Sequence, residues 1–404
     1  MRTSKIVLLG GFMAALGCHA AGDAPPGDGV DPPAGAGAMA PNLSTWGDEV
    51  LLSWLEPLQP GDGSDAAPYR LRFARYKEGA WGLPNTIVER GDFFANWADL
   101  PSIVPAAGGA LYAHWLQKTG EDLYAYSVMM ARLADGAQTW QMLGPLHDDG
   151  TRTEHGFVSL VPAGGEGGGV RGFWLDGREM ISGGAMTVRT ALVTNSVGTV
   201  RVLDERVCEC CSTSAAVASA GPVLVYRGRS DEEVRDISIV RLIDGQWSRP
   251  MTVHTDDWLI AACPVNGPAV AARGDLVVVA WFTGAVKQGA VLAAFSTDGG
   301  ASFSAPMTLD DTLPLGRVDV MLAPSGDAIV CWLDTATEAG AIRLCRVNPD
   351  GELGPLVTVA TTGQSRSSGL PRIAILDSAV LIVWTDQGDV SRLRGASVPL
   401  SDLH

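Results

Sequence analysis

The sequence has little positive charge and no long helical pattern. Its 404 residues include 29 Lys and Arg against 45 Asp and Glu, which gives a formal net charge of −16. Affinity for nucleic acid comes largely from basic side chains that neutralise phosphates, so this balance excludes a nucleic-acid partner. No long stretch has the 3.6-residue apolar period of a helix, and helices therefore do not organise the chain.

Charged residues are also few, at 18% of the chain, whereas 49 Gly and 24 Pro are present. The apolar residues occur in short runs of Val, Ile, Leu and Ala. This composition is typical of many brief strands joined by turns. We expect one closed all-β unit, because such folds accommodate a chain of this length without dividing into domains.

The N-terminus lacks an apolar run long enough to span a bilayer. Residues 1–17 have a short basic start and an apolar core from Ile6 to Leu16, the pattern of a secretory signal. The run that ends at Cys18 resembles a bacterial lipobox, although Ala15 stands where Leu is usual. We expect residues 18–40 to be a lipidated cysteine and a disordered tether, in the cell envelope facing the periplasm or the exterior. Simple secretion with a free or paired Cys18 is the alternative.

An internal repeat follows. Seven apolar runs each end in an aromatic residue: Val50–Trp54, Ala110–Trp115, Val170–Trp174, Pro222–Tyr226, Leu276–Trp281, Ala328–Trp332 and Val380–Trp384. The aromatic residues are 61, 59, 52, 55, 51 and 52 positions apart, which leaves room for four short strands and their turns. This period predicts the blades of a β-propeller.

A turn motif supports the same architecture. Residues 296–303 have Ser296, Asp298, Gly300 and Phe303 at the defined positions of an Asp box. In this motif the carboxylate caps backbone amides, the glycines allow φ > 0 and the aromatic ring anchors the turn. The chain thus resembles the Asp-box (BNR-repeat) sialidase-like superfamily.

From this resemblance we expect residues 41–404 to form a single propeller of four-stranded blades. Seven blades fit the repeat, and six with an irregular extra sheet are the alternative, since the superfamily's sialidases have six. The last repeat ends early, with a third strand at Arg392–Val398. Closure then requires either an outer strand from residues 36–40 or a three-stranded final blade.

The resemblance also predicts a functional mouth, formed by the loops that lead into each first strand and those between second and third strands. Arg317 and Arg372, with Arg227 or Arg229, are candidates to hold a carboxylate. Asp99 and Glu154 are candidate acid/base groups. Trp97, Trp258, Asn266 and Asp319 are further candidate ligand contacts at this mouth.

The match to sialidases themselves is incomplete. Their Arg-Ile-Pro opening is absent, and Tyr226 takes the place of a packing Trp, so we interpret it as a core residue rather than a nucleophile. We therefore expect a monomeric propeller that binds a polar or anionic glycan. Hydrolysis of this glycan is the catalytic form of the same expectation. A non-catalytic module that binds a glycan or an envelope protein is the alternative.

Five residues at this mouth suggest a second chemistry. Cys208, Cys210, Cys211 and Cys263 precede the first strands of the fourth and fifth repeats, and His155 precedes that of the third. Thiolates with imidazole suit Zn²⁺ or Cu⁺, or a redox site. Without Cys18, however, six cysteines remain, and exported cysteines are usually oxidised. We favour disulfides and no cofactor, with Cys263 bonded to one of the three, and Cys331 and Cys345 either paired or buried as thiols.

Overall fold

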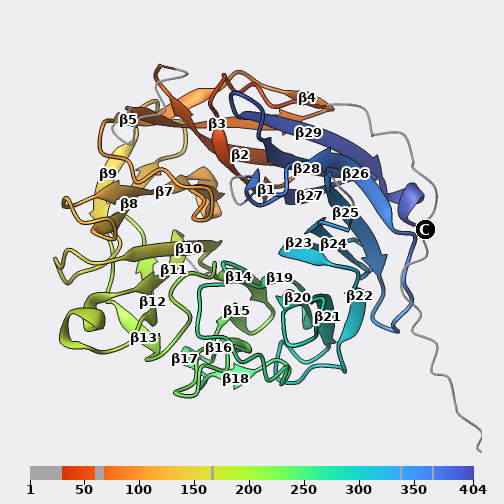
Figure 1. Cartoon of the computed structure of the whole chain (residues 1–404). Coiled ribbons are helices and arrows are strands. Elements are labelled where there is room, and N and C mark those ends of the chain that lie inside the picture. The colour runs from red at the N-terminus through yellow and green to blue at the C-terminus, as the bar shows by residue number, and fades with distance from the viewer. Residues whose placement is uncertain (1–29, 60–67, 165–167, 337–338, 366–367) are drawn as a thin grey trace, which may run out of the picture.

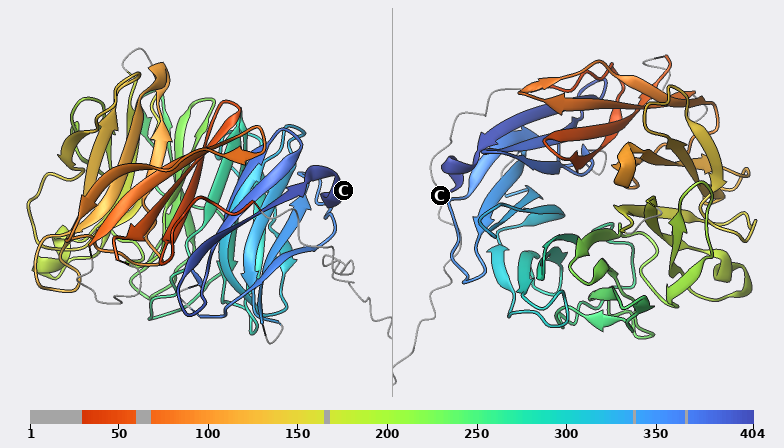
Figure 2. Two further views of the ribbon diagram at one scale, coloured as in Figure 1. Left: turned by 90° about the horizontal axis from the view of Figure 1, so that it is seen from above. Right: turned by 180° about the vertical axis from the view of Figure 1, so that it is seen from behind.

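The computed structural model describes residues 30–59, 68–164, 168–336, 339–365 and 368–404. The predicted signal, Cys18 and residues 19–29 of the predicted tether lie outside these ranges, whereas residues 30–40 contact the propeller. Seven antiparallel sheets are arranged in a ring, each with its first strand nearest the central axis (Figure 1; Figure 2, right). The chain is therefore a seven-bladed, all-β propeller, as the repeat predicts.

Six blades have four or five strands and the last has three. The first three blades are β1 (Met39–Trp46), β2 (Glu49–Pro57), β3 (Tyr69–Lys77), β4 (Ala80–Trp81) and β5 (Asn85–Arg90); β6 (Ser102–Pro105), β7 (Leu111–Lys118), β8 (Tyr126–Leu133) and β9 (Gln141–Pro145); and β10 (His155–Pro162), β11 (Val170–Asp176), β12 (Thr187–Val193) and β13 (Arg201–Asp204). Blade four is β14 (Ser214–Ala218), β15 (Gly221–Arg227), β16 (Ile237–Ile243), β17 (Gln246–Trp247) and β18 (Met251–Thr252).

The remaining blades complete the ring. They are β19 (Ala269–Arg273), β20 (Leu276–Thr283), β21 (Ala290–Ser296) and β22 (Met307–Asp310); β23 (Pro314–Leu322), β24 (Ala328–Asp334), β25 (Gly340–Val347) and β26 (Val357–Thr362); and β27 (Arg372–Leu376), β28 (Ala379–Asp386) and β29 (Arg392–Pro399). Short 3₁₀ turns lie at η1 (Ala107–Gly109), η2 (Arg178–Ser182) and η4 (Leu400–Leu403). Among the described residues, no helix has the length and hydropathy needed to cross a membrane.

The repeated aromatic residues all lie in the second strands and pack between neighbouring blades. Each of the seven is at least nine-tenths buried. A buried indole N–H needs an acceptor, and carboxylates supply several: Trp174 donates to Asp176 at 2.8 Å and Trp332 to Asp310 at 2.7 Å. Tyr226 keeps the pattern by donating its hydroxyl to Asp204 at 2.7 Å. The repeat is thus the packing element of the blades, and Tyr226 is a core residue.

The ring closes where the two ends of the described chain meet. Blades one and seven are adjacent in Figure 1, and residues before β1 lie along β29. The amide of Val30 donates to the carbonyl of Gly395 at 3.2 Å, and that of Gly37 donates to Ser391 at 2.8 Å. These residues form no strand, so the final blade remains three-stranded. Of the two predicted closures, the three-stranded blade is the one observed.

The turn between β21 and β22 has the hydrogen bonds that its sequence predicts. Asp298 accepts from the amides of Ala301 and Ser302, both at 2.9 Å. It also accepts from the hydroxyls of Ser302 at 2.6 Å and Ser296 at 2.7 Å, and these two bonds are the main cause of a carboxyl pKa well below the usual value. Gly300 has φ +85°, and Phe303 packs against the core between blades. The turn is a structural device.

Candidate functional site

A pocket of about 920 Å³ opens where loops of blades two to five converge. The loops before β10, β14 and β19 contribute, as do those between β7 and β8, β11 and β12, and β15 and β16. Its principal lining residues are Asp122, Leu123, Tyr124, Arg152, Glu154, Met180, Ile181, Glu209, Cys210, Arg229, Glu233, Arg235 and Cys263. These are the two kinds of loop that the sequence places at the mouth.

The rim of the pocket is apolar and exposed. Leu123, Tyr124 and Ile181 have 68%, 60% and 67% of their surface exposed. Large apolar side chains gathered at a pocket are typical of a ligand site rather than of free surface. Tyr124 combines a flat apolar ring with a polar hydroxyl, which suits a sugar face.

A buried acidic group lies beneath this rim. The hydroxyl of Tyr126 donates to Glu154 at 2.5 Å, and Asp99 accepts from the amide of Phe157 at 2.5 Å. Burial raises the pKa of Asp99 to about 7, helped by the nearby charge of Glu154. Burial also raises the pKa of Glu154, with a contribution from Cys208. Gly156 makes this crowding possible, because a Cβ there would lie 2.2 Å from Asp99 Oδ2.

Tyr126 itself is unsuited to attack a substrate. It is 2% exposed and stacked on Phe94 at 4.0 Å. Burial and the neighbouring carboxylates hold its pKa well above the usual value, so the phenol keeps its proton. Its hydrogen bond fixes the position of Glu154.

Arginine and glutamate side chains form a lattice on the pocket floor. Arg229 pairs with Glu209 and Glu233, and Arg235 pairs with the same two at 3.0 and 2.9 Å. Hydrogen bonds from both arginines lower the pKa of Glu233 to about 2. Arg152, in contrast, is exposed and makes no hydrogen bond or ion pair with any residue in the described ranges. It offers a free positive charge to a ligand.

The cysteines are all free thiols within the described chain, and the predicted disulfides are not observed. Cys208, Cys210 and Cys211 turn their sulfur atoms towards one another, and Cys263 is exposed on a different loop of the pocket. The three thiols differ in pKa. Hydrogen bonds from Cys210 and Cys211, together with the charge of Arg227, lower the pKa of Cys208. Burial raises the pKa of Cys211 to about 12.

Cys331 and Cys345 lie on paired strands but cannot form a bond. Cys331 is opposite Leu344, and Cys345 is opposite Val330. Side chains one position apart along a strand point to opposite faces, and the two thiols pack in different cores. They are therefore buried thiols, which was the second of the two predicted outcomes.

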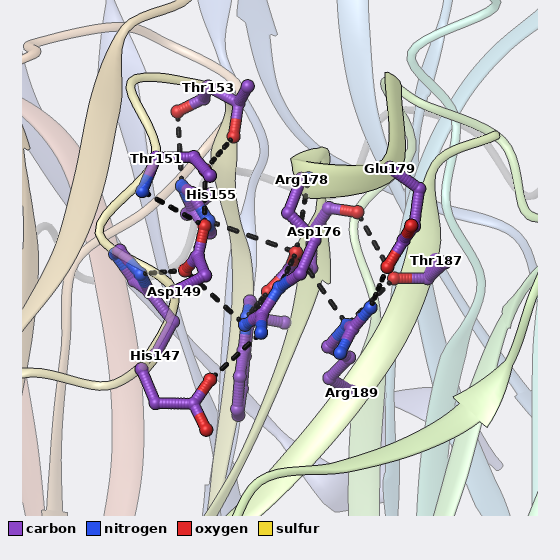
Figure 3. A network of polar contacts seen from close by, with 12 residues as sticks. His147, Asp149, Thr151, Thr153, His155, Asp176, Arg178, Glu179, Thr187 and Arg189 are labelled. Atoms are coloured by element: carbon purple, nitrogen blue, oxygen red, sulfur yellow. Dashed lines mark hydrogen bonds and ion pairs between the residues drawn. The ribbon is translucent and has the colours of Figure 1, made fainter. Parts of the chain in front are cut away.

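His155 lies away from the cysteines, so the predicted five-ligand cluster does not form. It stacks on His147 at a ring separation of 3.7 Å and lies 3.2 Å from Asp149 (Figure 3). His147, Asp149 and His155 bring potential ligand atoms within 4.8 Å. However, an imidazole binds an ion in its own plane at about 2 Å, and two parallel rings cannot both reach one ion in this way. The group is better described as a buried ionic network.

That network fixes the loop after β11. Arg178 donates to Asp176 at 2.8 Å from two nitrogens, and Arg189 reaches Glu179 at 2.9 Å (Figure 3). Asp176 in turn accepts the indole N–H of Trp174. These contacts place Met180 and Ile181 at the pocket rim.

The predicted carboxylate grip of Arg317 and Arg372 with Arg227 or Arg229 is not formed, because only Arg229 of the four lines the pocket. Arg227 is 1% exposed, and its guanidinium donates to three backbone carbonyls at 2.7 to 2.9 Å while lying 4.6 Å above the ring of Trp258. Arg317 donates to the carbonyl of Gly369 at 3.0 Å and lies over Trp97 at 4.6 Å. Both arginines thus brace loops, and each covers one face of a Trp that was a candidate ligand contact.

The other predicted contacts join neighbouring blades. Asn266 accepts from the amide of Arg317 at 2.7 Å and donates to Leu315 at 3.1 Å. Asp319 accepts from the amide of Ile373 at 3.0 Å and lies 3.7 Å from Arg372. Of the predicted residues, Glu154, Arg229, Cys210 and Cys263 line the pocket.

Several pocket residues were missed in the sequence. The loop that holds Leu123 and Tyr124 joins a second strand to a third, so the rule that defined the mouth also covers it. Arg152 lies two positions before Glu154, which the sequence had already placed there. Tyr126 had no signal, because its pairing with Glu154 depends on contact between two blades.

Comparisons with known proteins agree on the fold. No known protein family matches the chain, and no curated protein is similar to it in sequence. A polysaccharide lyase of family PL25, an ulvan lyase bound to -[GlcA(1-4)Rha3S]-, is 12% identical with a TM-score of 0.57, over 93% of this chain and 99% of that one. The GH93 α-L-arabinofuranosidase of Fusarium graminearum, in complex with arabinobiose, is 11% identical with a TM-score of 0.51, over 93% and 98%.

The endosialidase of phage phi92 is 8% identical with a TM-score of 0.53, over 93% of this chain and 69% of that one. At these identities the likeness shows the architecture alone. The chain thus has the β-propeller fold found among glycoside hydrolases and polysaccharide lyases.

Proposed function

We propose that the pocket between blades two and five binds an acidic glycan in a protein that is exported and lipid-anchored through Cys18. The observation that carries this proposal is the joint presence in one pocket of an exposed aromatic ring, a free cation and a carboxyl group with a raised pKa. Tyr124 supplies a stacking surface and Arg152 a partner for a uronate or sulfate group. The solved neighbours with bound saccharides have the same fold.

Two carboxyl groups in the pocket are suited to act as general acid and general base. Burial keeps the pKa of Glu154 high, which favours a proton donor, and the arginines keep Glu233 ionised. Groups whose environments push their pKa values apart are the usual basis of such an assignment. Glu154 would protonate the leaving oxygen of a glycosidic bond, while Tyr126 holds it in place.

Binding without turnover is the second candidate. It is favoured by the ion pairs of Glu209 and Glu233, because a carboxylate held by two arginines is a weak base or nucleophile. In that case Glu154 would serve as a hydrogen-bonding group for the ligand.

The experiment combines binding and turnover on matched acidic and neutral oligosaccharides. For the wild type we expect affinity for uronate or sulfated oligosaccharides, and release of new reducing ends or unsaturated products. Glu154→Gln should lower turnover at least 100-fold while binding is retained. The matched control is Glu205→Gln, an exposed glutamate outside the pocket, which should leave both unchanged.

Arg152→Ala should weaken binding of acidic oligosaccharides about tenfold and leave neutral ones unaffected. Acidic binding that survives this change would contradict the assigned cation. Binding with no product from any substrate would favour the second candidate, and no binding to either class of glycan would contradict both. The anchor is tested separately, by labelling cells with a fatty acid and comparing the Cys18→Ser variant.

A further inference from the structure

Three thiols converge at the inner edge of the pocket. Cys208 and Cys211 are each 1% exposed, and their sulfur atoms are 3.1 Å apart. Cys210 is partly exposed, lines the pocket, and has its sulfur 3.8 Å from that of Cys208. All three ligand atoms lie within 4.8 Å of one another. The arrangement is a three-sulfur cup on one short loop.

The loop is held in this shape before any ion is bound. The amide of Val207 donates to Met186 at 2.9 Å, and that of Cys208 donates to Arg227 at 3.0 Å. Both contacts are to the backbone of neighbouring segments, so replacement of a cysteine side chain does not remove them. A preformed cup lowers the cost of ordering the ligands when an ion binds.

The surroundings suit an anionic sulfur cluster. Nη1 of Arg235 lies 3.2 Å from the sulfur of Cys208 and 3.0 Å from Glu209. A buried cluster of thiolates around a cation of low charge carries net negative charge, which an adjacent guanidinium stabilises. The buried Arg227 is held close by, beneath the same loop.

We propose that Cys208, Cys210 and Cys211 bind one soft d¹⁰ metal ion, Cu⁺ or Zn²⁺. Thiolates select these ions over hard cations such as Mg²⁺ and Ca²⁺. With Zn–S bonds of about 2.3 Å, tetrahedral geometry separates the sulfurs by about 3.8 Å. The separation of Cys208 and Cys210 has this value, and Cys211 needs a shift of less than about 1 Å. Because Cys210 lines the pocket, a fourth coordination position on the ion would face the pocket. Zn²⁺ would bind a water molecule there, whereas three-coordinate Cu⁺ needs no further ligand.

The thiols open into the same pocket as the acidic-glycan site, but none of them is a residue that the glycan proposal uses, so each proposal can fail without the other. His155 and Cys263, which the sequence grouped with these thiols, are outside it. The proposed protein ligands are therefore the three sulfurs alone.

The test uses the full chain, reduced and kept free of oxygen. It is titrated with Cu⁺ and with Zn²⁺ in separate arms, each against a chromophoric chelator of known affinity. One equivalent of one ion should remain bound after desalting, and X-ray absorption should show sulfur ligands at the distance typical of that ion. Preference for Cu⁺ with three sulfurs indicates a trigonal site, whereas preference for Zn²⁺ with an added light ligand indicates a tetrahedral one.

The variants identify the ligands. Cys210→Ser and Cys208→Ser should each weaken binding at least 100-fold, and Cys263→Ser should change it less than threefold. Cys210→Ser is the more informative of the two, because the side chain of Cys210 is partly exposed whereas that of Cys208 is 1% exposed. Circular dichroism and thermal unfolding confirm that each variant is folded.

Three results would overturn the proposal. The first is no stoichiometric binding of either ion by the reduced protein. The second is binding that survives Cys210→Ser or disappears with Cys263→Ser. The third is a protein that is purified with a Cys208–Cys211 disulfide and that binds neither ion after this disulfide is reduced.

Discussion

The buried guanidinium of Arg227 gives the sharpest prediction about stability. It donates to the carbonyls of Asn266, Arg235 and Phe282, which lie on three separate segments. A hydrogen bond from a charged donor contributes about 1.5 kcal/mol or more, and loss of the donor leaves buried carbonyls without a partner. Arg227→Met removes all three bonds but keeps apolar contact with Trp258. Because removal of the guanidinium also relieves the cost of burying its charge, we expect a net loss of about 3 kcal/mol in the free energy of unfolding.

The matched control is Arg229→Met, two positions further along the chain. Arg229 is partly exposed and pairs only with glutamates at the pocket surface, so its loss should cost about 1 kcal/mol or less. Urea unfolding followed by tryptophan fluorescence measures both. If Arg227→Met is as stable as the wild type, or if Arg229→Met loses as much, the distinction between a bracing and a pocket arginine is wrong.

Two further predictions concern the acidic group and the Asp-box turn. Gly156→Ala would press a Cβ against Asp99 and Tyr126, so we expect the free energy of unfolding to fall by about 1–3 kcal/mol and activity to be reduced. Gly91 has open space around it, so Gly91→Ala should have little effect when both variants are compared by thermal unfolding. Asp298→Ala should cost about 1–2 kcal/mol at pH 7 through lost hydrogen bonds. Because the folded pKa of Asp298 lies below its unfolded value of 3.8, this stabilisation is present above pH 3.8 and is lost as pH falls through the folded pKa. The gap between wild type and variant in urea midpoint should therefore narrow towards pH 3, and a gap independent of pH would contradict the assignment.

The sequence predicts the architecture because its signals are local and repeated. Each apolar run ending in an aromatic residue forms a second strand, and the spacing between runs sets the number of blades. The turn at Asp298 is likewise determined by residues within five positions of one another. Loop position in the repeat also predicts which face carries the pocket.

The chemistry of individual side chains depends on partners that are distant in sequence. Arg227 and Arg229 are equivalent candidates in the sequence, yet one is enclosed by backbone carbonyls and the other reaches the pocket. Cys331 and Cys345 lie on consecutive strands of one blade, but the strand register places them on opposite faces of the sheet. His155 was grouped with the cysteines by its place in the repeat, whereas its ring turns to His147 and Asp149.

The most direct test of the central claim is a crystal structure of the protein soaked with a uronate oligosaccharide that it binds in solution. The account predicts a sugar ring on Tyr124, its carboxylate at Arg152 and a glycosidic oxygen within hydrogen-bonding distance of Glu154. Saccharide found instead in the channel opening lined by Pro105, Pro162 and Pro324 would contradict the assignment of the functional face.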